Sequence, residues 1–228
     1  MKNIWENPWF TIPVLVFFNA GLLLAFFVPY GDEILYLNGL RHEPFNTAFR
    51  LITKLGEVYA FLIAGVALLF WRFRFALLIA ITGLIILPTT YIFKEHFSAD
   101  RPITFFQEKG MRQSVVTVPG VDLNTGQTSF PSGHTTAAFG LYSILALIAG
   151  SRRLRWGIVF AGLAILVAVS RVFLVQHFLA DIMAGATLGL LIGSLVWRLN
   201  EMPFFRQSGV LDKRIAIGAF ERQTAVRE

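Results

Sequence analysis

Cysteine is absent from this chain of 228 residues, and charged residues are scarce, at 15%. Without cysteine there is no disulfide framework, no thiolate metal site and no cysteine nucleophile. Hydrophobic residues instead make up 55% of the chain, phenylalanine alone occurs 23 times, and the mean hydropathy is +0.62. This composition excludes an ordinary soluble domain and indicates an integral membrane protein. Its chemistry must rest on residues other than cysteine.

Six apolar runs are each close to the roughly 20 residues that a membrane-spanning helix needs. They predict an all-α polytopic membrane protein with about six transmembrane helices. We expect one membrane domain over 1–228 with no cleaved signal peptide, because Val28-Pro29-Tyr30-Gly31 gives no small-x-small cleavage pattern after the first run. The expected spans cover about 11–29, 51–71, 75–93, 132–150, 156–175 and 178–197, with an outer loop at 94–131 and a cytoplasmic tail at 198–228.

Basic residues gather in the short connections between these runs and after the last one. Because short basic loops mark the cytoplasmic side, both termini are predicted to be cytoplasmic and the outer loop to face outward from a cytoplasmic (inner) membrane. The same pattern explains the net charge of +6 without a nucleic-acid partner, which would require a soluble basic surface. The residues are Arg72, Arg74, Arg152, Arg153, Arg155, Arg198, Arg206, Lys213 and Arg214.

The outer loop begins with K-E-H-F-S-A-D-R-P, in which Lys94 and Arg101 are seven residues apart. If this stretch is helical, both cations lie on one face, and Pro102 is expected to end the helix. Two cations on one face can bind an anion. An interfacial lysine beside a solvated arginine would give the same pattern, so this pair needs further support.

The next cluster is Ser132-Gly133-His134, at the expected outer N-terminus of the fourth span. Free backbone N–H groups at a helix N-terminus bind anions, and glycine lets a ligand oxygen approach the backbone closely. The serine adds a hydroxyl donor, and His134 is within reach of whatever the anion is attached to. A plain helix N-cap explains Ser-Gly equally well.

The third cluster surrounds the outer connection between spans five and six, where His177 and Asp181 are four residues apart and Arg171 precedes them. On the first turns of span six they share a face, so the carboxylate can hold one imidazole nitrogen and leave the other nucleophilic. An aspartate at the edge of a bilayer is costly without a partner. A His–Asp pair that merely joins two helices is the alternative.

All three clusters are expected on one membrane face, where they supply cations, a helix N-terminus, two histidines and a carboxylate. That set suits phosphoryl transfer. The clusters resemble, in order and complete, the signature motifs of the type 2 phosphatidic acid phosphatase superfamily, in its integral-membrane branch. They read Lys94-x6-Arg101-Pro102, then Pro131-Ser132-Gly133-His134, then Ser170-Arg171-x5-His177-x3-Asp181.

The resemblance implies a role for each motif residue. His177 is the nucleophile that forms a phosphohistidine, Asp181 orients it, and His134 protonates the leaving oxygen. No metal and no other cofactor is implied. The phosphate-binding residues implied are Lys94, Arg101, Ser132, Gly133 and Arg171.

We therefore expect a membrane phosphatase that removes a terminal phosphate from a lipid phosphate or diphosphate at the outer leaflet. Undecaprenyl diphosphate is favoured by family analogy alone; phosphatidylglycerophosphate, phosphatidic acid and the 1-phosphate of lipid A stay open, as does the oligomeric state. A lipid phosphotransferase would use the same site, and a non-catalytic phosphate-binding protein or transporter is the further alternative. A vanadium-dependent haloperoxidase shares such an anion site, but the six spans argue against it.

Other polar residues are assigned no chemistry by the sequence. Lys54 and Glu57 are interpreted as a pair at helical spacing, and the 103–130 loop is expected to touch a lipid headgroup or to anchor itself at the interface. Structural or interfacial roles are also expected for Asn19, His42 and His96, and loop contacts for Phe105, Phe106, Lys109 and Arg112.

Overall fold

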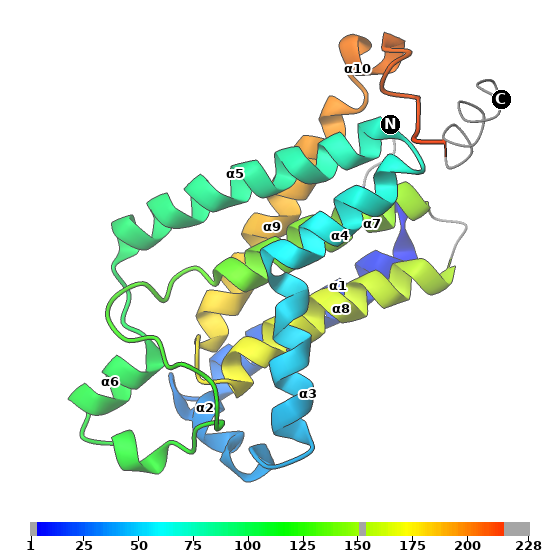
Figure 1. Cartoon of the computed structure of the whole chain (residues 1–228). Coiled ribbons are helices and arrows are strands. Elements are labelled where there is room, and N and C mark those ends of the chain that lie inside the picture. The colour runs from blue at the N-terminus through cyan, green and yellow to red at the C-terminus, as the bar shows by residue number, and fades with distance from the viewer. Residues whose placement is uncertain (1–3, 151–153, 217–228) are drawn as a thin grey trace, which may run out of the picture.

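The computed structural model describes residues 4–150 and 154–216, and every regular element within them is a helix (Figure 1). The expected all-α fold is confirmed. The longer helices are α1 (Pro8–Phe27), α4 (Val58–Leu69), α5 (Phe73–Phe97), α7 (Gly133–Ala149), α8 (Leu154–Phe173) and α9 (Leu179–Leu199). The shorter ones are η1 (Ile4–Glu6), α2 (Asp32–Tyr36), η2 (Asn38–Leu40), α3 (Phe45–Ile52), η3 (Thr53–Gly56), α6 (Pro102–Glu108), η4 (Arg112–Ser114) and α10 (Pro203–Gln207).

The expected count of about six spans holds approximately. Among the described residues, α1, α5, α8 and α9 are long and apolar enough to cross a membrane. A fifth candidate is formed by Phe45–Gly56 and Val58–Leu69 together, which are bent by 57° where η3 meets α4, and α7 is a shorter apolar helix. The second span was expected as one continuous run over 51–71, but the chain is extended at Glu57, which ends η3 and begins α4.

Helix α7 is the centre of the bundle and packs against α9, α8 and α5. A ridge of small residues on α9, formed by Gly185, Gly189 and Gly193, faces it. A side chain on Gly185 would place its Cβ atom 2.7 Å from the carbonyl oxygen of Ser132. Such a close approach is possible only without a Cβ atom. The ridge therefore fixes the start of α7 directly against α9.

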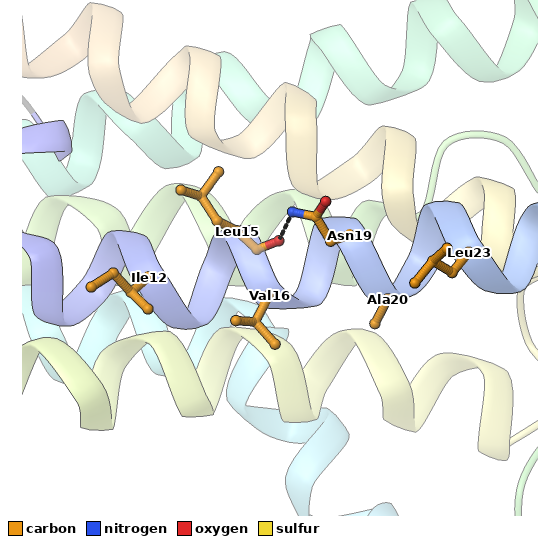
Figure 2. A pocket seen from close by; sticks show the side chains of 6 residues that line it. All are labelled: Ile12, Leu15, Val16, Asn19, Ala20 and Leu23. Carbon is orange, nitrogen blue, oxygen red and sulfur yellow. Dashed lines mark hydrogen bonds between the residues drawn. The ribbon is translucent and has the colours of Figure 1, made fainter.

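The outward face of α1 carries a groove of about 420 Å³ that is lined by Ile12, Leu15, Val16, Asn19, Ala20 and Leu23 (Figure 2). Its one polar side chain is Asn19, whose amide N–H donates a 2.8 Å hydrogen bond to the carbonyl oxygen of Leu15 within the same helix. Such a largely apolar helix face suits contact with lipid chains.

The two ends of the bundle differ. At one end the chain after α9 returns to the α4–α5 turn, where the Phe73 N–H donates to the Lys213 carbonyl (2.9 Å) and Arg74 forms a 3.1 Å ion pair with Asp212. The expected tail thus packs on the bundle as far as it is described. The opposite end carries α2, α3 and α6 (Figure 1). The motif residues lie toward this second end.

Candidate active site

A tight turn between α8 and α9 joins Arg171 to His177. The Gln176 N–H donates to the Arg171 carbonyl (2.9 Å) and the Val175 N–H to the Val172 carbonyl (3.0 Å), which is the Schellman pattern at a helix end. Val175 has a positive φ of 58°, a conformation that costs a β-branched residue energy and is usual for glycine. The His177 N–H also donates to the Arg171 carbonyl, at 3.2 Å. The turn therefore holds the histidine beside the arginine's own backbone.

His177 and Asp181 meet in the interior, where each is only 2% exposed. Nδ1 of His177 lies 3.4 Å from Oδ2 of Asp181, and that oxygen also accepts hydrogen bonds from Ser129 Oγ (2.6 Å) and the Phe178 N–H (2.9 Å). A carboxylate beside Nδ1 favours the tautomer with the proton on that nitrogen. Nε2 is then left with its lone pair.

The environment of His177 favours the neutral imidazole. Burial, and then the charges of Arg101, Arg171 and Lys94, hold the pKa of His177 well below its usual range. Arg101 is the nearest of these cations, with Nη1 only 3.1 Å from Nε2. A neutral Nε2 surrounded by positive charge is arranged to attack an electrophile that carries negative charge.

Three cations, Arg101, Arg171 and Lys94, act electrostatically on His177. Arg101 is anchored by a 2.9 Å hydrogen bond from Nη1 to the carbonyl of Gln176, and Arg171 by a 2.6 Å bond from Nη1 to Oγ1 of Thr53. The buried Nε atom of Arg171 has no hydrogen-bond partner within the described part of the chain. An unpartnered buried donor here fits an anion bound at this place. Lys94 is half-buried and within electrostatic reach of both arginines.

The connection between Lys94 and Arg101 differs from the expected single helix. Helix α5 ends at Phe97 because Ser98 adopts a left-handed conformation with φ 43°. Pro102 does not end that helix; it opens α6 at the first helical position, where its missing N–H costs nothing. Arg101 is the extended residue before α6, and this bend, not a shared helix face, turns it toward His177.

Ser132 is the N-cap of α7, and its hydroxyl oxygen accepts from the N–H of Thr135 at 3.4 Å. The expectation that its backbone N–H is free is wrong, because that group donates to the carbonyl of Asp181 at 3.0 Å. This bond ties the start of α7 to the start of α9. Beside Gly133 the space is open, with no atom within 4 Å of where a Cβ atom would sit. An anion can approach the helix N-terminus there.

His134 lines a cavity of about 620 Å³. Its Nε2 atom is 3.7 Å from Oε1 of Glu57. Arg171, Thr53 and Gln176 line the same cavity. Among the described residues no group of three or more His, Asp or Glu side chains is placed to hold a metal ion.

The sequence analysis named neither Ser129 nor Thr53 and assigned Glu57 only to a pair with Lys54. In the structure these three residues contact Asp181, Arg171 and His134 respectively. Ser129 stands shortly before the Pro131–His134 motif, so a search for hydroxyl partners of the buried aspartate could have found it. Thr53 is 118 positions and Glu57 is 77 positions away in sequence from its partner, and no local pattern marks either residue. The loop residue Phe105 packs its ring on Tyr30 and on Phe178, which is the neighbour of His177 in sequence.

Comparison of the sequence with protein families leads to the same class of protein as the geometry of the site. The sequence model of the PAP2 superfamily matches residues 71–204, more than half of the chain. The chain belongs to this superfamily, as its three motifs predicted. It is a multi-pass membrane protein of that family.

Curated relatives carry names of lipid phosphatases. The chain is 31% identical over 85 residues to the lipid A 1-phosphatase of Porphyromonas gingivalis, covering 37% of this chain and 19% of that protein. It is 38% identical over 87 residues to phosphatidylglycerophosphatase B of Bacillus subtilis, covering 35% and 43%. These two matches thus span less than half of either relative. A longer match, 25% identical over 173 residues, covers 73% of this chain and 81% of undecaprenyl-diphosphatase BcrC of Bacillus subtilis.

Two solved structures share the fold. LpxE of Aquifex aeolicus superposes with a TM-score of 0.61 at 21% identity, over 75% of this chain and 96% of that one. A transmembrane PAP2-type phosphatidylglycerolphosphate phosphatase of Bacillus subtilis gives 0.57 at 25% identity, over 83% and 96%. Both likenesses extend over nearly the whole of the solved chains.

Proposed function

We propose that this chain is a lipid phosphatase that removes the terminal phosphate of a lipid phosphate or diphosphate through a phosphohistidine on His177. The observation that carries the proposal is the position of His177, with one ring nitrogen at the carboxylate of Asp181 and the other 3.1 Å from Arg101. This arrangement supports an activated nucleophile beside a phosphate site.

In the first half of the reaction, the lone pair on Nε2 attacks phosphorus and the bond to the leaving oxygen breaks. Arg101, Arg171 and Lys94 neutralise the charge on the phosphoryl oxygens, together with the N–H groups at the start of α7. His134 gives a proton to the leaving oxygen, so that an alcohol or a lipid phosphate departs. Asp181 keeps the Nδ1 proton in place while the imidazole becomes positively charged.

In the second half, water attacks phosphorus and the bond to Nε2 breaks. His134, which has lost its proton, takes one from that water and is restored. The cycle consumes one water and releases one phosphate. If an alcohol enters in place of water, the same steps give a phosphotransferase, so the acceptor decides between the two activities.

The substrate we favour is undecaprenyl diphosphate. It is supported by the relative named undecaprenyl-diphosphatase, which matches over most of both chains. Lipid A phosphates and phosphatidylglycerophosphate are the competing substrates. A relative named lipid A 4'-phosphatase matches over 172 residues at 28% identity, and the lipid A 1-phosphatase and phosphatidylglycerophosphatase B match shorter segments at higher identity. The cavity beside His134 is where the leaving group of any of them would lie.

We place the site at the outer face of the cytoplasmic membrane, with both termini inside and one membrane domain over 1–228. The basic side chains of Arg72, Arg155 and Arg198 support this orientation because they belong to helix ends away from the motif residues.

A phosphate-release screen tests the proposed function directly. Purified protein in detergent is supplied with undecaprenyl diphosphate, phosphatidylglycerophosphate, phosphatidic acid and a lipid A 1-phosphate, and free phosphate is measured with and without an added alcohol acceptor. We expect release from at least one of them, with undecaprenyl diphosphate the best. Transfer to the alcohol in preference to water would identify a phosphotransferase. Activity with none, in folded protein, would refute the proposal.

A further inference from the structure

The break in the second span places a carboxylate at the edge of the active site. Glu57 is the residue before α4, with extended backbone angles of φ −97° and ψ 172°. A residue at this position commonly caps its helix, yet the Glu57 side chain makes no capping hydrogen bond. Its Oε1 atom instead lies 3.7 Å from Nε2 of His134.

The turn that carries Glu57 is fixed to the site by its neighbours. A Cβ atom on Gly56 would lie 2.8 Å from the carbonyl oxygen of His134, so only glycine allows this contact. The Tyr142 hydroxyl donates to the carbonyl of Leu55 (3.0 Å), and Thr53 accepts from Arg171 (2.6 Å). These contacts tie the turn to both α7 and α8. The carboxylate is therefore held beside the imidazole by packing on each side.

The positive charges around His134 give the Glu57 carboxylate a role in the protonation of the imidazole. The charges of Arg171 on α8, His177 in the turn before α9, Lys94 on α5 and Arg101 before α6 all act on His134. A positive charge near an imidazole disfavours its protonated form. A general acid must nonetheless carry its proton when the substrate arrives.

Few anions are available to balance those cations. The Asp181 carboxylate already accepts hydrogen bonds from Ser129 and the Phe178 N–H and lies beside the His177 ring. Within the described part of the chain, Glu57 is the carboxylate that lies within ion-pair distance of His134, and Lys54 forms no ion pair with it there. The expected pairing of Lys54 with Glu57 is thus replaced by one between Glu57 and His134.

We infer that Glu57 is a positioning residue that orients the His134 imidazole and keeps it protonated for donation to the leaving oxygen. The inference rests on the proposed phosphatase function, in which His134 is the general acid. Glu57 takes no proton from the substrate: it shares the charge of the imidazolium before the P–O bond breaks and stabilises it again after water is deprotonated.

Substitution of Glu57 tests this role, with Asp122→Asn as the matched control. Both positions line the same cavity, and both changes turn a carboxylate into an amide of the same shape. Glu57→Gln should lower kcat/KM for an alkyl phosphate by about tenfold or more, a part of the 10²–10⁴ that general acid catalysis contributes. It should change kcat/KM for p-nitrophenyl phosphate less than about twofold, since a good leaving group needs little protonation. The alkaline limb of the alkyl phosphate profile should move to lower pH, and Glu57→Asp should restore part of the rate.

Three outcomes would overturn the inference. Equal losses with both substrates would indicate a structural role for Glu57. No loss with either substrate would show that the Glu57–His134 ion pair does not contribute to catalysis. The same effect from Asp122→Asn would point to the general charge of the cavity. Retained hydrolysis of p-nitrophenyl phosphate reports at the same time that the variant is folded.

A second measurement does not depend on turnover. The chain has four histidines, so the ring signal of His134 in ¹³C-labelled protein can be assigned as the one lost in His134→Asn. Glu57→Gln should shift the titration midpoint of this signal to lower pH, and Asp122→Asn should leave it in place. An unmoved midpoint refutes the inference even if the enzyme is active. A protein that hydrolyses no lipid phosphate but shows the shift refutes the proposed function alone.

Discussion

The hydroxyl of Ser129 donates a 2.6 Å hydrogen bond to Oδ2 of Asp181, the same oxygen that faces Nδ1 of His177. The serine is fully buried and precedes α7, whereas the aspartate belongs to the first turn of α9. This bond and the one from the Ser132 N–H to the Asp181 carbonyl connect the two motifs directly. If His177 is the nucleophile, as we propose, its orientation should depend on a residue outside the motifs.

The first prediction is that Ser129→Ala lowers kcat by about tenfold to a hundredfold, because a hydrogen bond to a charged group contributes about 1.5–3 kcal/mol. The aspartate keeps the Phe178 N–H, so the loss should stay smaller than that caused by Asp181→Asn. Ser143→Ala is the control, since Ser143 is equally buried in α7 but bonds only to the Gly140 carbonyl. A Ser129→Ala enzyme with the kcat of the control would show that this bond does not matter.

The second prediction concerns pH. Because burial and Arg101 lower the pKa of His177, the neutral nucleophile persists below the usual imidazole range near 6.5, and the acid limb of kcat/KM should lie below that pH. Arg101→Gln removes the nearest cation, so the limb should move to higher pH. The second ionisation of the phosphate substrate affects both enzymes alike.

Profiles of kcat/KM from about pH 4.5 to 9 measure that shift, given an ordinary imidazole value near 6.5. Lys109→Gln removes the same charge at a residue whose ammonium lies over the Phe105 ring, and it should leave the limb in place. An acid limb at one pH in wild type and Arg101→Gln would contradict this account of the nucleophile.

Much of the fold could be predicted because apolar length and periodicity are local properties. The helices α1, α8 and α9 begin and end within a few residues of the expected spans. The bend at Glu57 could not be predicted, because no helix-breaking proline stands next to it in the sequence. The close contact of Gly56 with the His134 carbonyl, which is a tertiary contact, decides the conformation there. Local sequence carries no record of such contacts.

In the candidate site, too, the residues could be predicted from the sequence but their long-range contacts could not. The cations and histidines that the motifs name could be listed from spacing alone, but their mutual arrangement could not. Arg101 reaches His177 through a bend at Ser98, which no helical spacing describes. Thr53 holds Arg171 from the bent second span, at a distance of 118 positions in sequence. Long-range partners of this kind become visible only when the helices are packed.

The third prediction tests the covalent step. His177→Ala should abolish turnover, and Asp181→Asn should reduce it strongly because the Nδ1 proton loses its acceptor. Saturating EDTA should leave the wild-type rate almost unchanged, since the charges around the nucleophile are supplied by protein cations. Quenching without acid, after rapid mixing with ³²P-labelled substrate, should trap phosphate on His177. Label on Ser132, or a strict need for Mg²⁺, would show that the nucleophile is assigned wrongly.

The fourth prediction is the orientation in the membrane. Because native cysteine is absent, each variant carries a single thiol: Lys109→Cys places it at the end of α6, and Arg155→Cys places it on α8. In intact cells an impermeant thiol reagent should label position 109 and spare position 155 until the membrane is opened. The reverse pattern would place the active site on the cytoplasmic side. Arg153, one of the basic residues expected on the cytoplasmic side, lies outside the described residues, so Arg155 is used in its place.

The last prediction concerns the division of labour between His134 and Lys94. Cleaving a phosphate ester expels an alkoxide unless the oxygen is protonated as it leaves, and a general acid is typically worth about 10²–10⁴ in rate. His134→Ala should therefore slow hydrolysis of phosphatidic acid far more than that of p-nitrophenyl phosphate. Lys94→Ala should slow both about equally, because its charge acts on the phosphoryl group itself. The measurement is the ratio of kcat/KM for the two substrates in each variant, with folding checked by size-exclusion chromatography. If the two variants lose both activities in the same proportion, His134 binds phosphate and another group supplies the proton.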